Sequence, residues 1–79
     1  INSIYPNPIN EETKVDLNKN SKEYSVVILD SSSRIISRFY IKSHSFYLFE
    51  YISLNSPRGI YILKIKNDKN KIQTKKIVI

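Results

Sequence analysis

The chain has 79 residues, a formal net charge of +6 at pH 7, and neither cysteine nor methionine. Its length predicts one domain over residues 1–79, and the missing initiator methionine predicts that this domain is cut from a longer protein. The composition excludes disulfides, thiol chemistry and a histidine-rich zinc site, and no apolar run approaches the roughly 20 residues of a transmembrane helix.

The chain begins with a short strand-like stretch that runs into two prolines. Ile4 and Tyr5 precede Pro6, Asn7 and Pro8. Each proline fixes φ, removes a backbone donor and biases the preceding residue toward extended backbone. We expect a stiff elbow, which either ends an edge strand or carries the chain from one sheet to the other.

Six further strands are predicted from alternating apolar residues and the polar turns between them. They cover residues 13–18, 23–30, 35–41, 45–51, 60–66 and 72–79. Strand 23–30 also has Val27 and Leu29 on its second face, which predicts that both of its faces are covered. About seven short strands with turns about every ten residues indicate a small immunoglobulin-like antiparallel β-sandwich.

The last two predicted strands carry the clearest pattern. Gly59, the only glycine, precedes strand 60–66 and offers unrestricted φ there. One face of this strand is apolar and the other is partly basic. It should pair with strand 72–79 across the turn "NDKNK". The basic final strand is then either a docking edge or an edge that its lysines protect from aggregation, and the residues leave both readings open.

No catalytic constellation is present, so we expect neither an enzyme nor a cofactor. Ser31, Ser32 and Ser33 form a turn without the setting of a nucleophile. His44 is expected on the surface, and a single glycine cannot form a phosphate-binding loop. Nucleic-acid binding is also disfavoured, because much of the basic charge lies after position 63 without a recognisable binding motif.

Three motifs lie far apart in the chain: Tyr5-Pro6-Asn7-Pro8, then Gly59-Ile60-Tyr61, and finally Lys75-Lys76-Ile77-Val78-Ile79. In this order and at these separations, they resemble the type A C-terminal sorting domain of proteins exported by the type IX secretion system. The resemblance runs from about Ser3 to Ile79. It includes a strand that ends in Asp30 and a turn, where the family usually has glycine and this chain has Ser33. This departure implies a turn that tolerates a side chain.

The resemblance implies a secretion signal rather than a catalyst. Such domains follow diverse cargo and direct it from the periplasm through the outer-membrane translocon, with outer-membrane shuttle proteins as further partners. A sortase-like cysteine peptidase can cut before the domain, and the cargo reaches the cell surface or the medium. The three motifs above are then the expected recognition residues. The open sheet edges would also allow a strand-swapped homodimer.

Two other functions are compatible with a small β-sandwich. An accessory carbohydrate-binding module would present exposed aromatic side chains, for instance Tyr40, Tyr47 and Tyr51, on one flat face. Aromatic residues at this density more often form a core. A structural repeat of a surface adhesin is the other alternative, although no repeat occurs within these residues.

Overall fold

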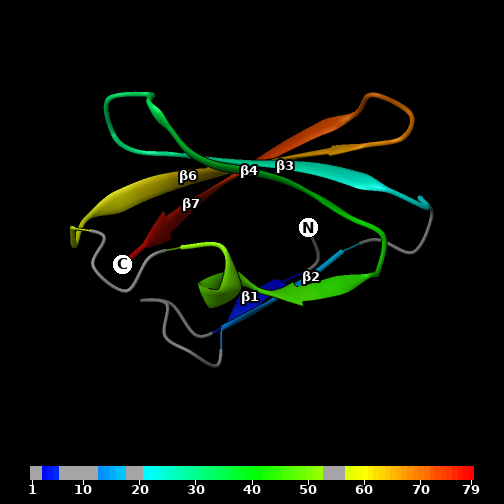
Figure 1. Ribbon diagram of the computed structural model, residues 1–79, viewed down its shortest axis with the longest axis horizontal. Helices are drawn as coiled ribbons and strands as arrows, with labels where there is room; N and C mark the ends of the chain where they lie inside the picture. The colour runs from blue at the N-terminus through cyan, green and yellow to red at the C-terminus, as the bar shows by residue number, and fades with distance from the viewer. Residues whose placement is uncertain (1–2, 6–12, 18–20, 53–56) are drawn as a thin grey trace.

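The computed structural model describes residues 3–5, 13–17, 21–52 and 57–79. These residues form two antiparallel sheets, which lie one above the other in Figure 1. The smaller sheet has the strand order β1-β2-β5, with the bounds Ser3–Tyr5, Lys14–Asp16 and Ser45–Tyr47. The larger sheet has the order β4-β3-β6-β7, with the bounds Ile35–Ile41, Tyr24–Leu29, Ile60–Asn67 and Ile72–Val78. A short 3₁₀ helix, η1, covers Leu48–Glu50.

Along the described strands, the chain passes from one sheet to the other three times. After β2 the chain crosses to the larger sheet, returns to the smaller sheet for β5, and crosses again to end in the β6–β7 hairpin. Crossings of this kind between two packed antiparallel sheets are typical of immunoglobulin-like sandwiches. The predicted fold class, a small all-β sandwich, is therefore confirmed.

The core lies between the inward faces of the two sheets. The fully buried apolar side chains are Val15, Val26, Ile28, Leu48, Leu63 and Ile77. Each such side chain contributes about 1.5–3 kcal/mol by leaving water. Beside them, the rings of Phe39 and Tyr51 stack with centroids 3.7 Å apart, and Phe46 contacts both rings edge-on. Much of the aromatic content thus belongs to the core.

Strand β3 is buried on one face only. Tyr24, Val26 and Ile28 point into the core and are buried, whereas Val27 and Leu29 are half-buried on the opposite face. The prediction that both faces are covered is wrong. No second layer of the described residues lies on that side, and β4 and β6 flank β3 within the sheet. The outward face of the larger sheet is therefore a surface of the protein.

The strand predicted over residues 45–51 is shorter than expected. It ends at Tyr47, and the chain turns through η1, where the Leu48 N–H donates to the Thr13 carbonyl over 3.1 Å. The turn keeps Leu48 fully buried, as an extended strand would have done. Phe46 and Leu48 are buried and Tyr47 is exposed. The sequence therefore alternates here as it would in a longer strand.

The first strand is an edge strand of the smaller sheet. Tyr5 of β1 lies opposite Lys14 of β2, so the two strands pair directly. Of the two roles predicted for the proline elbow, carrying the chain between sheets is wrong, because the strands on either side belong to the same sheet. The other role agrees with β1, an edge strand that ends at Tyr5. Pro6, Asn7 and Pro8 themselves lie outside the described residues. Strand β2 is also shorter than the predicted 13–18.

Candidate functional site

The β6–β7 hairpin brings together the two C-terminal motifs singled out in the sequence. Its register runs without a shift from Ile60 opposite Val78 to Lys66 opposite Ile72. Tyr61 consequently faces Ile77 across the pair. The predicted hairpin across "NDKNK" is confirmed, and β7 is the last strand of the larger sheet.

Gly59 extends this ladder by one pair beyond the strands. Its N–H donates to the Ile79 carbonyl over 3.1 Å, and the Ile79 N–H donates to the Gly59 carbonyl over 2.9 Å. Gly59 has a φ of 153°, which side-chain-bearing residues rarely adopt, yet a Cβ there would meet nothing within 4 Å. The backbone conformation, and not a lack of space, therefore requires glycine at this position.

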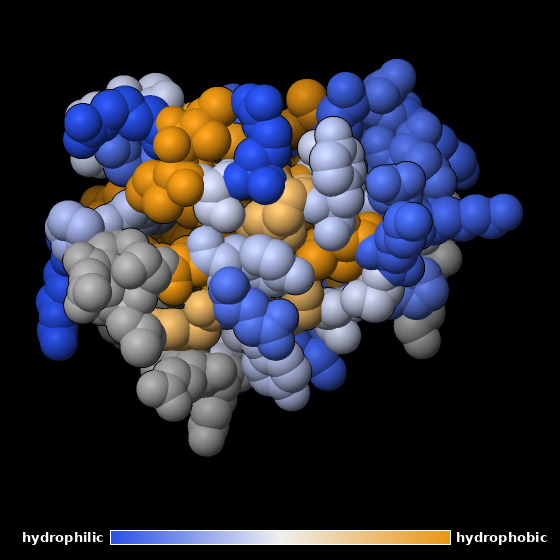
Figure 2. Space-filling view, viewed as in Figure 1, coloured by the Kyte–Doolittle hydropathy of each residue, from blue (hydrophilic) through white to orange (hydrophobic). Residues whose placement is uncertain are grey.

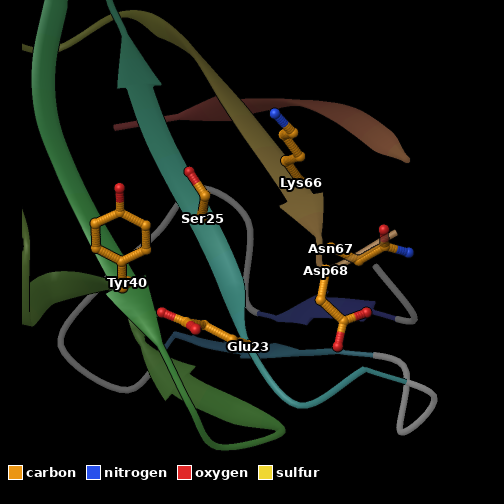
Figure 3. A pocket seen from close by; sticks show the side chains of 6 residues that line it. All are labelled: Glu23, Ser25, Tyr40, Lys66, Asn67 and Asp68. Carbon is orange, nitrogen blue, oxygen red and sulfur yellow. The ribbon is translucent and has the colours of Figure 1, made fainter. Parts of the chain in front are cut away.

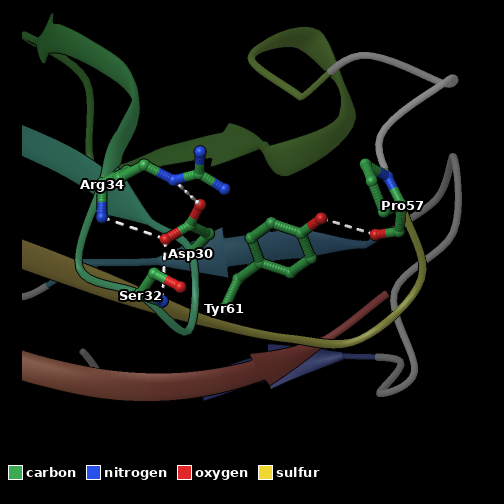
Figure 4. A network of polar contacts seen from close by, with 5 residues as sticks. All are labelled: Asp30, Ser32, Arg34, Pro57 and Tyr61. Atoms are coloured by element: carbon green, nitrogen blue, oxygen red, sulfur yellow. Dashed lines mark hydrogen bonds and ion pairs between the residues drawn. The ribbon is translucent and has the colours of Figure 1, made fainter.

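Tyr61 connects the inward face of the hairpin to the segment that leads into it. Tyr61 and its neighbour Ile77 are 5% and 1% exposed, respectively. The Tyr61 hydroxyl donates a hydrogen bond to the Pro57 carbonyl, as Figure 4 shows. This bond holds the approach to β6 against the strand and so helps to position Gly59 opposite Ile79.

The two lysines of the last motif lie on opposite faces of β7. Lys75 faces the buried Leu63, and Lys76 faces Ile62, which lies on the outward face. Both lysines are exposed. Lysine on an edge strand discourages unspecific strand pairing, and Lys75 does so from the inward face. The lysines thus protect this strand, which is outermost among the described strands of the larger sheet.

The turn from β3 to β4 is held together by Asp30 (Figure 4). Its Oδ1 accepts from the backbone N–H groups of Ser32 and Arg34, both over 2.9 Å, and its Oδ2 accepts from Arg34 Nε over 2.9 Å. The pKa of the Asp30 carboxyl is lowered, chiefly by the backbone N–H of Arg34. Ser33 has a φ of 64°, so the turn does tolerate a side chain, but in a conformation that favours glycine.

The turn from β6 to β7 has the same construction. Asn67 Oδ1 accepts from the backbone N–H groups of Lys69 and Lys71, both over 2.9 Å, and Asn70 has a φ of 63°. In both turns the first residue is Asp or Asn and the fourth has positive φ, the pattern of a type I turn followed by a left-handed residue. The likeness of the two turns was not predicted, although "DSSSR" and "NDKNK" both have Asp or Asn at the first position.

A hydrogen bond ties the hairpin turn to the segment before β3. The Lys22 N–H donates to Asp68 Oδ2 over 3.0 Å. This backbone donor is the main reason that the pKa of the Asp68 carboxyl is lowered. The hairpin is thus attached to the rest of the sandwich at its turn as well as along β3.

An open groove of about 270 Å³ lies beside this turn (Figure 3). It is lined by Glu23, Ser25, Tyr40, Lys66, Asn67 and Asp68. The aromatic row expected of a carbohydrate-binding face is not formed, however. Tyr40 lies on β4 and Tyr47 on β5, in different sheets, and the half-buried Tyr51 stacks on Phe39.

The N-terminal motif is not brought to the hairpin in the described residues. Tyr5 belongs to the smaller sheet, and the rest of the motif is outside the described ranges. His44 is exposed, as predicted. In the part of the chain that the structure describes, no group of three or more His, Asp or Glu side chains could hold a metal ion. Nor is any helix there long and apolar enough to cross a membrane.

Comparison with known families gives one result that covers nearly the whole chain. The family model described as a secretion system C-terminal sorting domain matches residues 3–79. The matched range contains β1 and the complete β6–β7 hairpin with Gly59 and Ile79. Comparisons with curated proteins and with solved structures found no match.

Proposed function

The chain belongs to the family of secretion system C-terminal sorting domains, and we propose that the outer edge of β7 at Thr74 and Lys76 is the surface that the type IX secretion machinery recognises. The family is one of sorting signals and not of enzymes, and it implies export to the cell surface or the extracellular space. The resemblance found in the sequence is confirmed by the family match.

The pairing of Gly59 with Ile79 carries the proposal. It joins the glycine motif and the C-terminal motif in one hairpin, whose second strand is outermost among the described strands of the larger sheet. An edge strand can be extended by a strand from a partner, with main-chain hydrogen bonds for affinity and alternate side chains for specificity.

The register identifies which backbone groups of β7 would bind the partner strand. Because Gly59 and Ile79 exchange both hydrogen bonds, every second pair along the antiparallel ladder does the same. The pairs Tyr61–Ile77 and Leu63–Lys75 are of this kind. The backbone groups of Thr74 and Lys76 therefore point away from β6, toward the outer edge of β7.

We further propose the route that the family resemblance implies. The 79 residues follow a cargo protein, whose precursor crosses the periplasm and is delivered to the outer-membrane translocon with the help of shuttle proteins. A sortase-like cysteine peptidase then cuts before the domain, and the cargo is attached to the surface or released. Pro6, Asn7 and Pro8 would form the rigid junction between cargo linker and sandwich. Two copies of the chain would form a strand-swapped homodimer by exchanging an edge strand such as β7.

A reporter secretion assay tests the sorting role. The 79 residues are fused behind an export signal and a fluorescent reporter, in a host with a working type IX system and in its translocon-deficient mutant. We expect reporter outside the first host and in the periplasm of the second. Reporter held in the periplasm of both hosts would contradict the proposal and favour the carbohydrate-binding alternative, which a glycan pull-down then tests.

A further inference from the structure

The outward face of the larger sheet carries charge of one sign. Strands β3, β4, β6 and β7 contain no Asp or Glu. The burial of alternate residues and the strand register place four exposed cations on the side away from the smaller sheet, which we call the outer face: Arg38, Lys64, Lys66 and Lys76. Among the described residues, the acids Asp16 and Glu50 belong to β2 and η1, in the other layer.

These cations are neighbours. Arg38 and Lys64 flank Val27 in one row across the sheet, so their Cα atoms are about 10 Å apart. Lys76 is diagonal to Lys64 across the β6–β7 pair, about 7–8 Å away. At physiological salt the Debye length is about 8 Å, so Lys64 and Lys76 repel each other, whereas Arg38 is largely screened from Lys64. An anionic partner that covers the cluster relieves the repulsion between the two lysines.

Exposed apolar side chains surround the cations. Of the exposed large hydrophobic residues in the described ranges, all but Tyr47 lie on the strands of the larger sheet: Ile35, Ile36, Tyr40, Ile60 and Ile72. Tyr40 and Ile72 are 67% and 61% exposed, and both are on the outer face by register. Figure 2 shows hydrophobic and hydrophilic residues side by side along the upper margin, where Figure 1 places this sheet.

We propose that the outer face is a docking surface for an anionic lipid bilayer. Lysine and arginine on such a face can reach acidic headgroups while their aliphatic stems lie along apolar surface. Isoleucine and tyrosine side chains then enter the boundary between headgroups and acyl chains. Of the acids at the ends of the face, Asp30 is paired with Arg34, whereas Glu23 and Asp68 lie at the other end, beside the groove.

The shape of the face favours a bilayer over a single extended polymer. The groove that includes part of this face lies at one end, where Glu23 and Asp68 contribute carboxylates to its lining and disfavour an anionic ligand. The cations Arg38, Lys64 and Lys76 are outside that groove, on the open sheet. An open array of separate cations among aliphatic residues matches a surface of separate headgroups.

The inference goes beyond the proposed sorting role. Recognition by the secretion machinery uses the backbone edge of β7, whereas lipid binding uses side chains of the sheet face. A chain that is secreted but does not bind vesicles would refute the lipid inference alone. A chain that binds vesicles but is not secreted would refute the sorting proposal alone.

Vesicle co-sedimentation of the 79-residue chain tests the inference. Vesicles of equal parts phosphatidylglycerol and phosphatidylcholine should bind the chain, pure phosphatidylcholine should not, and added salt should release it. Replacement of Arg38, Lys64 and Lys76 by Gln removes three outer-face charges. We expect affinity to fall on the order of 100-fold, since each basic residue contributes about fivefold at an anionic surface.

A second triple variant provides a matched control for charge. Replacement of Lys14, Lys42 and Lys69 by Gln removes the same charge from exposed positions outside the outer-face cluster. Its affinity should fall by much less than that of the outer-face triple. Equal losses in both variants would overturn the inference, because binding would then follow net charge and not the face. Circular dichroism establishes that each variant is folded.

A fluorescent pair of variants tests orientation without removing any charge. The chain has no tryptophan, so Tyr40→Trp reports on the outer face and Tyr47→Trp on the other sheet. With the phosphatidylglycerol vesicles, emission of Tyr40→Trp should shift to the blue and that of Tyr47→Trp should not. Equal shifts would contradict docking through the outer face. Tighter binding to immobilised polyglutamate than to phosphatidylglycerol vesicles of equal charge would also overturn the inference, in favour of an acidic polypeptide partner.

Discussion

Gly59 and Ile79 exchange two backbone hydrogen bonds, so the residue before β6 fixes the position of the residue after β7. The pair closes the hairpin at the end opposite its turn. It also determines, through the alternation of an antiparallel ladder, which groups of β7 face outward. A single glycine therefore sets the geometry of the edge on which the proposed recognition depends.

Replacement of Gly59 by Val should destabilise the domain. A β-branched residue tolerates a φ of 153° poorly, and backbone held in such a region costs about 1–3 kcal/mol. Urea unfolding of Gly59→Val measures this loss, with Ile60→Val as the control at an adjacent exposed position. An unchanged unfolding midpoint for Gly59→Val would show that Gly59 does not need this conformation.

Replacement of Ser33 by Gly should stabilise the domain. Ser33 has a φ of 64°, and the left-handed conformation costs a side-chain-bearing residue roughly 1–2 kcal/mol. Because glycine loses more freedom on folding, a net gain of about 0.5–1 kcal/mol is expected. The matched change is Asn70→Gly, which should gain less because asparagine tolerates this conformation better. Thermal unfolding that ranks the two gains in the reverse order would contradict this reasoning.

Replacement of Asp30 by Asn should weaken the acid sensitivity of the domain. The pKa of Asp30 is lowered in the folded state, chiefly by the Arg34 N–H. Its charge therefore stabilises the fold above about pH 4, and this contribution is lost as the pH falls from there through the lowered pKa. Melting temperature measured against pH should decline less steeply below about pH 4 in Asp30→Asn. Identical profiles would show that Asp30 does not contribute to the decline.

The long alternating segments of the larger sheet were predictable from sequence, and shorter ones were not. Strand β6 and its hairpin with β7 follow from sustained alternation and a polar turn. Residues 45–51 misled the prediction because Leu48 is equally buried in a strand and in the turn that replaces it. Val27 and Leu29 suggested a strand covered on both faces, but both are half-buried on the outward face of the larger sheet.

The residues of the candidate site could be predicted from the sequence, but their arrangement could not. The glycine and lysine motifs mark the hairpin in the sequence, yet the Gly59–Ile79 pair depends on the register, which no local pattern contains. The cation cluster could not be predicted for a similar reason. Arg38 and Lys64 are distant in the chain and come close only because β4 and β6 both pair with β3.

Secretion of a reporter fused to the domain with Thr74→Pro, compared with Thr74→Ala, examines the proposed role of the β7 edge. Proline removes the N–H of Thr74, which points away from β6, so the hairpin ladder keeps its bonds. Alanine leaves that N–H in place. With both variants folded by circular dichroism, we expect Thr74→Ala to be secreted and Thr74→Pro to stay in the periplasm. Normal secretion of Thr74→Pro would show that the machinery does not bind the outer edge of β7 at Thr74.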